Sequence, residues 1–120
     1  MKAAHVLVVD DERPNIEIMV RILALKGHRG TGADSVEGAA AALSCAAYDL
    51  VLLDHVLPGA TGMQSLGKLR ALTQAPIYIM SGYSDDDTRQ DAMLLGASGF
   101  LPKPLDCVVI FALIESLPER

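Results

Sequence analysis

Cysteine is scarce in this chain of 120 residues, and so are basic side chains and long apolar runs. The two cysteines, Cys45 and Cys107, have neither Cys-X-X-Cys nor metal-ligand spacing, which fits reduced thiols and a cytoplasmic location. The net charge of −5 argues against a nucleic-acid surface, because phosphate contacts need clustered cations. The N-terminal apolar stretch ends at Asp10, too early for a signal peptide or a membrane-spanning helix.

Apolar side chains, by contrast, make up 51% of the residues. A chain of this length and composition is large enough to bury a core and too apolar to stay disordered. It shows no repeat, no linker and no low-complexity segment. We therefore expect a single folded domain that spans residues 1–120.

Short apolar segments alternate with amphipathic segments five times along the chain. The expected strands cover residues 5–9, 29–33, 48–53, 76–80 and 98–101. The expected helices begin near residues 14, 35, 63, 84 and 106, and a glycine at position 27 ends the first of them. Strands that alternate with helices in this way form a parallel sheet with helices on both faces, so the fold class is α/β.

Acidic side chains stand where two of these strands end. Asp54 follows the apolar run 48–53, and the pair Asp10-Asp11 follows the first strand. Ligands of open α/β sheets bind outside the carboxyl ends of the strands, so these carboxylates would share one pocket, and that pocket needs a cation. Asp54 could instead be a turn residue, but the nearby acidic pair and a later lysine, Lys103, disfavour that interpretation.

Five segments carry a resemblance to a known family. They are Asp10-Asp11, residues 52–59, Gly62, Met80-Ser81-Gly82 and residues 96–104. In this order, and covering essentially the whole chain, they resemble the receiver domain of two-component response regulators. The resemblance implies a flavodoxin-like, doubly wound sheet of five parallel strands in the order 2-1-3-4-5, with five helices in a three-layer α/β/α arrangement.

The resemblance also implies a chemistry for the acidic pocket. Asp54 would accept a phosphoryl group from a sensor histidine kinase or a histidine phosphotransfer protein, with Mg²⁺ as cofactor. Asp11, Asp54 and the backbone carbonyl of Val56 would bind the metal directly, and Asp10 would bind it through a water. The domain would be a signalling switch of a phosphorelay, which catalyses only its own phosphorylation and autodephosphorylation, rather than a turnover enzyme.

Further residues complete the machinery that the resemblance implies. Lys103 would pair with Asp54 and then with the phosphoryl oxygens, and Ser81 would donate its hydroxyl to the phosphoryl group. Phe100 would be the switch residue that swings inward when Ser81 moves, so that phosphorylation remodels this face for partner binding or dimerisation. His55 could compete as a phosphoacceptor or bind metal, but we favour a rim residue without a chemical role.

Two positions depart from the commonest pattern of the family. Val56 lies two residues after the acceptor, and Tyr83 lies two residues after Ser81. In the family these positions flank the path of the water that hydrolyses the acyl phosphate, and apolar or aromatic side chains there would hinder that water. We therefore expect a phosphorylated state that lives longer than in the fast chemotaxis-type regulators.

The last helix is apolar nearly all round, because no polar side chain occurs from Cys107 through Ile114. A surface helix normally carries a polar stripe. Alignment to the family pattern turns four of its residues to the sheet: Cys107, Ile110, Phe111 and Ile114. The same alignment places four apolar residues of this helix at positions that are usually polar in the family: Val108, Val109, Ala112 and Leu113. Leu94, on the fourth helix, also occupies a usually polar position. Single exposed apolar residues are normal, but several on one face favour a partner surface or a homodimer interface.

Two other functions fit the sequence less well. An aspartyl-phosphate hydrolase of the haloacid-dehalogenase type needs a second Asp two residues after the nucleophile, where this chain has Val56. A phosphorylation-independent interaction module would not need the intact acidic site. The chain ends with the fifth helix, as expected either of a stand-alone receiver or of a receiver cut from a longer protein, and we expect it to bind neither nucleic acid nor membrane.

Overall fold

The computed structural model describes residues 3–57, 60–82, 90, 92–103 and 105–117. Five parallel strands form one sheet in the order β2-β1-β3-β6-β7. The strands are β1 (His5–Val9), β2 (Arg29–Ala33), β3 (Leu50–Asp54), β6 (Ile77–Ser81) and β7 (Gly99–Pro102). Counted along the chain, this order is second, first, third, fourth and fifth, which confirms the expected 2-1-3-4-5 arrangement.

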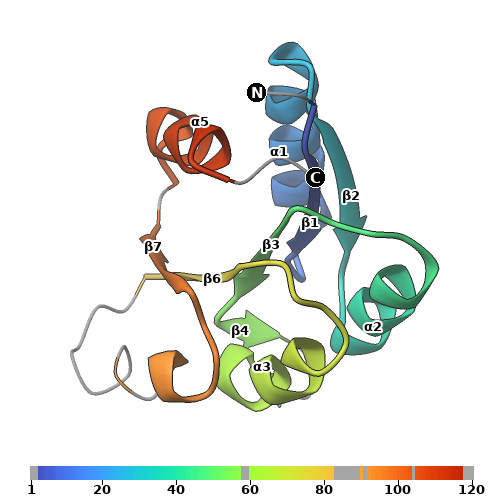
Figure 1. Ribbon diagram of the computed structural model, residues 1–120, viewed down its shortest axis with the longest axis vertical. Helices are drawn as coiled ribbons and strands as arrows, with labels where there is room; N and C mark the ends of the chain where they lie inside the picture. The colour runs from blue at the N-terminus through green and yellow to red at the C-terminus, as the bar shows by residue number, and fades with distance from the viewer. Residues whose placement is uncertain (1–2, 58–59, 83–89, 91, 104, 118–120) are drawn as a thin grey trace.

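Helices cover both faces of the sheet (Figure 1). The helices are α1 (Arg13–Leu25), α2 (Val36–Cys45), α3 (Gly62–Arg70) and α5 (Cys107–Glu115). Residue 90 and residues 92–94 are also helical and belong to the expected fourth helix, whose expected start at residue 84 lies outside the described residues. A short antiparallel hairpin of β4 (Val56–Leu57) and β5 (Ala60–Thr61), which the sequence did not predict, lies between β3 and α3.

Two hydrophobic clusters fill the space between the three layers. Along β1, Val6 and Val8 pack into the cluster that also contains Met19 of α1 and Ile110 of α5. The alternate side chains of the same strand pack into the second cluster, with α2 and α3. Because both faces of the sheet are covered, the central strands read as continuous apolar runs in the sequence.

Local signals set the ends of the first two helices. Helix α1 begins at Arg13, one residue before the expected Pro14, and Gly27 after its end adopts a φ of 80°. Only a residue without a β-carbon takes that conformation without strain. Helix α2 is capped by Ser35, whose hydroxyl oxygen accepts a hydrogen bond from the Gly38 N–H at 3.0 Å.

Glycines in β2 allow α1 to pack closely on the sheet. A β-carbon at Gly32 would overlap the γ2 carbon of Ile16, and one at Gly30 would lie 3.0 Å from the γ2 carbon of Val20. The glycines that weaken the strand pattern in the sequence are therefore required by the packing of α1 against β2.

Helix α5 corrects one of the expectations for the last helix. Leu113 is half-buried and packs against the cluster that holds Ile110, although we expected it to be exposed. It lies three residues after Ile110 and four before Leu117, so it shares their buried face. Val108 and Val109 are exposed as expected, with 75% and 45% of their surfaces accessible, and Ala112 is exposed too.

No helix within the described residues has the length and apolar character that a membrane span requires. The longest of the named helices, α1, has 13 residues.

Candidate functional site

Asp54 and Lys103 form an ion pair at the carboxyl edge of the sheet. Asp54 is the last residue of β3, and only 5% of its surface is exposed. The Lys103 Nζ lies 3.0 Å from the Asp54 Oδ2, with about a third of the lysine side chain accessible. A buried carboxylate needs such a partner, because an unpaired charge in the protein interior is costly.

Strand β6 lies between β3 and β7 and fixes the spacing of the pair. Ser81 ends β6, is buried, and accepts a backbone hydrogen bond from the Lys103 N–H at 3.0 Å. On the other side, the carbonyl oxygen of Met80 accepts from the His55 N–H at 2.9 Å. Ser81 therefore ends the strand that lies between the strand of Asp54 and the strand that precedes Lys103.

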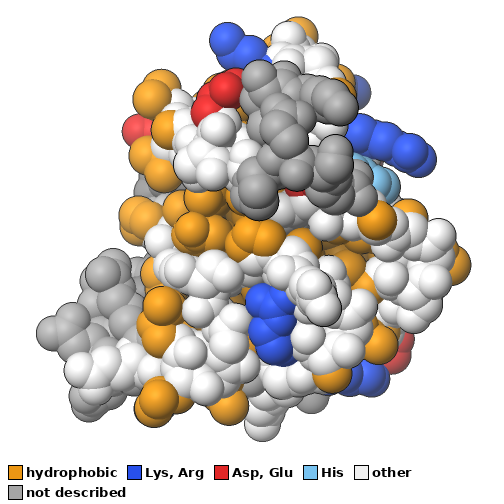
Figure 2. Space-filling model, in the orientation of Figure 1, with side chains coloured by type: hydrophobic (Ala, Val, Ile, Leu, Met, Phe, Trp, Pro, Cys, Tyr) orange, Lys and Arg blue, Asp and Glu red, His pale blue; other side chains and the backbone are white. Residues whose placement is uncertain are grey.

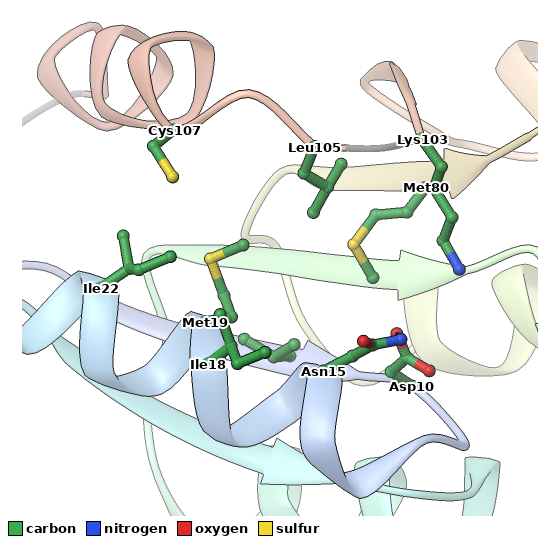
Figure 3. A pocket seen from close by; sticks show the side chains of 10 residues that line it. Asp10, Asn15, Ile18, Met19, Ile22, Met80, Lys103, Leu105 and Cys107 are labelled. Carbon is green, nitrogen blue, oxygen red and sulfur yellow. The ribbon is translucent and has the colours of Figure 1, made fainter.

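Asp10 brings a second buried carboxylate to the same edge. It follows β1, and its backbone N–H donates to the Ala33 carbonyl at 3.0 Å. Its Oδ1 accepts from the Glu12 N–H at 2.9 Å, and the side-chain amide of Asn15 lies 3.5 Å from its Oδ2. Figure 3 shows Asp10 and Asn15 at the same end of a cleft as Lys103.

Asp10 belongs to a group of three carboxylates that is suited to a cation. One carboxylate oxygen from each of Asp10, Asp11 and Glu12 lies within 4.8 Å of the others, and the last two side chains are exposed. Oxygen ligands of this kind fit a hard divalent ion such as Mg²⁺, which keeps several waters. Three carboxylates in this small volume repel one another unless a cation balances them.

Glu12 and Asn15 were not among the residues that the sequence analysis selected. Glu12 continues the run Asp10-Asp11, so its position in the sequence was a usable signal. Asn15 was not identifiable, since its role depends on where the first turn of α1 brings its amide.

Of the remaining predicted site residues, some have described side chains and others do not. His55 is half-buried beside the acceptor, and Phe100 of β7 is half-buried against the cluster on the α2–α3 face. Leu94 is 85% exposed. The backbone of Val56 opens β4, but its side chain and the whole of Tyr83 lie outside the described residues.

Comparison with known proteins agrees with this geometry. Residues 6–115 match the family model described as the response regulator receiver domain. The response regulator protein FleR of Pseudomonas aeruginosa is 35% identical over 113 residues, a match that covers 93% of this chain and 24% of FleR. This chain spans about half the length of other curated relatives, such as the transcriptional regulatory protein YvrH of Bacillus subtilis.

Solved structures agree as well. A two-component response regulator from Clostridium difficile matches with a TM-score of 0.89 at 26% identity, covering 94% of this chain and 93% of that one. A response regulator from Burkholderia pseudomallei, described with a phosphorylated aspartic acid and a calcium ion, matches in fold with a TM-score of 0.86 at 24% identity, covering 94% of this chain and 67% of that one. The chain therefore belongs to the family of response regulator receiver domains, the phosphorylation-activated switches of two-component signalling.

Proposed function

We propose that Asp54 is the residue of this receiver that accepts the phosphoryl group, and that Mg²⁺ at the acidic group assists the transfer. The observation that carries the proposal is the Lys103 Nζ at 3.0 Å from the buried Asp54 Oδ2, at one sheet edge with Asp10. The donor would be a sensor histidine kinase or a histidine phosphotransfer protein, met in the cytoplasm. The receiver unit would span residues 1–120.

The chemistry follows from charges at this edge. An Asp54 carboxylate oxygen attacks phosphorus, the phosphorus–nitrogen bond of the donor breaks, and the imidazole of the donor keeps the electron pair. Charge spreads over the phosphoryl oxygens in the transition state, so the ammonium of Lys103 stabilises it. Mg²⁺, when bound by Asp11, Asp54 and the Val56 carbonyl, would neutralise further charge, with Asp10 acting through a water.

Ser81 and Phe100 would convert this event into a signal. The Ser81 hydroxyl would bond to the phosphoryl oxygens at the end of β6, and Phe100 on the neighbouring β7 would follow it inward. The receiver would exist in an inactive and an active arrangement. The phosphoryl group can shift the equilibrium between them only by as much as it interacts more favourably with the active one. The receiver would thus catalyse its own phosphorylation and dephosphorylation and otherwise act through partners.

A small-molecule phosphodonor tests the proposal without the natural kinase. The protein would be incubated with acetyl phosphate and Mg²⁺, and its intact mass would be measured. We expect one added phosphoryl group, which does not form when EDTA is present from the start and is absent from Asp54→Asn. Equal labelling of Asp54→Asn would refute Asp54 as the acceptor.

Val56 and Tyr83 would tune the lifetime of the acyl phosphate by hindering the attacking water. The double variant Val56→Asn with Tyr83→Glu should autodephosphorylate faster, as measured by the decay of the phosphorylated mass. An unchanged decay rate would show that these two positions do not control hydrolysis.

Exposed apolar side chains around the edge strand β7 would form the readout surface. Leu94 precedes β7 and Val108 follows it, and both side chains are exposed. Val109 and Ala112 on α5 are exposed as well. Apolar groups gathered on one face favour a partner or a second copy of the chain.

Light scattering after size exclusion tests this surface, with beryllofluoride and Mg²⁺ as the acyl-phosphate mimic. We expect a shift from monomer to dimer that Asp54→Asn and Val108→Glu abolish. Leu25→Glu is the matched control, because Leu25 is also a largely exposed apolar residue but lies on α1. A monomer that beryllofluoride leaves unchanged would exclude activation-dependent dimerisation.

A further inference from the structure

A cleft of about 320 Å³ lies between α1 and α5, over the face of the sheet that these helices cover. Val8 and Met80 line it from the strands, Met19 and Ile22 from α1, and Cys107 from the start of α5. Figure 3 shows the side chains of Met19, Ile22 and Cys107 directed into the space between the two helices. This volume is at the lower end of the range for small-molecule sites, whose walls are mostly apolar.

Hydrophobic side chains also reach the surface here. Figure 2 shows them gathered in a band between α5 and the strands below it. Ile18, which lines the cleft from α1, is 57% exposed, so a molecule from solvent can reach the cleft without opening the core. Apolar surface left accessible in this way favours a ligand that removes it from water.

One end of the cleft is polar, and around it carboxylates outnumber ammonium groups. Asp10, Asn15 and Lys103 line this end. The ammonium of Lys103 already pairs with Asp54 at 3.0 Å, whereas Asp10 lies beside two further carboxylates, those of Asp11 and Glu12. A positively charged group is therefore favoured at Asp10, and an anion would face net repulsion.

We propose that this cleft binds a small amphipathic amine, with its apolar body between α1 and α5 and its ammonium group on the Asp10 carboxylate. The ammonium and a divalent cation would then compete for the acidic group. A bound amine would hinder the metal-dependent phosphorylation of Asp54; this consequence and the competition with the metal both rest on the proposed function.

Methionine methyl groups report on binding directly. Protein labelled with ¹³C at the methionine methyls would be titrated with hexylamine and followed by NMR. Met19 and Met80 line the cleft, whereas Met93 is half-exposed on the helical segment 92–94 and serves as the internal control. We expect saturable shifts of the Met19 and Met80 signals and none of Met93.

Probes with the same alkyl body test the head group. Hexanol should bind about tenfold more weakly than hexylamine, the difference that one charge-assisted hydrogen bond makes, and hexanoate should be weaker still. Asp10→Asn should remove the preference of the cleft for the amine over the alcohol. Equal binding of hexanoate and hexylamine would contradict the placement of a cation at Asp10.

Matched variants locate the site. Ile22→Phe fills the cleft and should abolish the methionine shifts, whereas Leu25→Phe, on the exposed side of the same helix, should leave them intact. In the unaltered protein, hexylamine should slow alkylation of half-buried Cys107 but not that of exposed Cys45. This measurement keeps the proposal testable even where Ile22→Phe disturbs folding.

Two further outcomes would overturn the proposal. The first is the absence of saturable shifts at Met19 and Met80, or equal shifts at Met93, since either shows that no specific site exists. The second is hexylamine binding whose affinity Mg²⁺ leaves unchanged, in a protein that Mg²⁺ itself still binds. Failure of Mg²⁺ to support phosphorylation would instead count against the proposed function, so the two failures are distinguishable.

Discussion

Asp54 and Lys103 show how single residues define this receiver. Each lies at the end of a different strand, and the sheet brings their charged atoms to 3.0 Å from each other. The carboxylate is buried, so its charge is tolerated because the ammonium is next to it. The same pair that stabilises the resting fold is therefore the one that would face the incoming phosphoryl group.

Removal of Lys103 should cost stability as well as activity. Lys103→Ala removes the ammonium that lies 3.0 Å from the buried Asp54 carboxylate, and we expect the free energy of unfolding to fall by about 1–3 kcal/mol. This range is below that of a fully buried pair, because 32% of the lysine side chain is accessible. Urea unfolding measures the change.

The double variant provides the control. Lys103→Ala combined with Asp54→Asn removes both charges, so most of the lost stability should return. A double variant as unstable as Lys103→Ala alone would mean that the lysine acts through packing rather than through its charge.

Gly32 is a second residue whose identity is fixed by its surroundings. A β-carbon there overlaps Ile16, whose branched side chain has one strongly preferred rotamer in a helix. Gly32→Ala should lower the free energy of unfolding by about 1–3 kcal/mol. Gly67→Ala, at an exposed position of α3 where nothing lies within 4 Å, should raise it by about 0.5–1 kcal/mol. Thermal unfolding of both variants distinguishes overlap from a general effect of alanine.

At this scale the sequence predicted the carboxylates and the lysine but not their neighbours. Asp10, Asp54 and Lys103 stand at strand ends that short apolar runs mark, and the structure brings them together. The roles of Asn15 and of the glycines in β2 were not predicted, because they depend on where α1 packs rather than on any local pattern.

Among the elements, α5 combines a buried and an exposed apolar face. Its sequence predicted a helix that begins near residue 106, and the structure has α5 at Cys107–Glu115 with Asp106 before it as N-cap. The period of the apolar residues could not separate the faces, since apolar side chains occur on all sides. The prediction that Leu113 is exposed was wrong for this reason. The hairpin β4–β5 was missed for a related reason, since two-residue strands carry too little pattern to detect.

The cap of α5 offers a test at the scale of the element. The Asp106 Oδ1 accepts from the Val108 N–H at 2.9 Å, which satisfies one of the free donors at the helix start. Asp106→Ala should therefore destabilise the protein by about 1 kcal/mol in urea unfolding. Asp106→Asn keeps an oxygen acceptor and should stay close to the original stability. If both variants lose the same amount, the hydrogen bond is not what Asp106 contributes.

At the scale of the whole molecule, the carboxyl edge of the sheet collects charges from strands far apart in the sequence. Local patterns predicted each strand, but the order of the strands depends on long-range pairing and came from the resemblance to the receiver family. The structure and the family match confirm both. Carboxylates outnumber ammonium groups at this edge, and the Mg²⁺ proposed to bind there would offset their mutual repulsion.

Mg²⁺ should therefore raise the global stability. At a free concentration of about 100 times its Kd, the free energy of unfolding should increase by about 2.7 kcal/mol. Asp11→Asn should lose most of this gain, whereas Asp34→Asn, which alters a carboxylate paired with Arg13 away from the acidic group, should retain it. Thermal unfolding at several Mg²⁺ concentrations gives the comparison. An equal gain in all three proteins would indicate that the ion binds elsewhere.

Chemical identification of the phosphorylated residue tests the central claim most directly. The protein would be phosphorylated with acetyl phosphate and Mg²⁺, reduced with borohydride, which converts an aspartyl phosphate to homoserine, and sequenced by tandem mass spectrometry. We predict homoserine at position 54 alone, and none without Mg²⁺. A phosphoryl group found on His55, or homoserine at another position with Asp54 intact, would contradict the account.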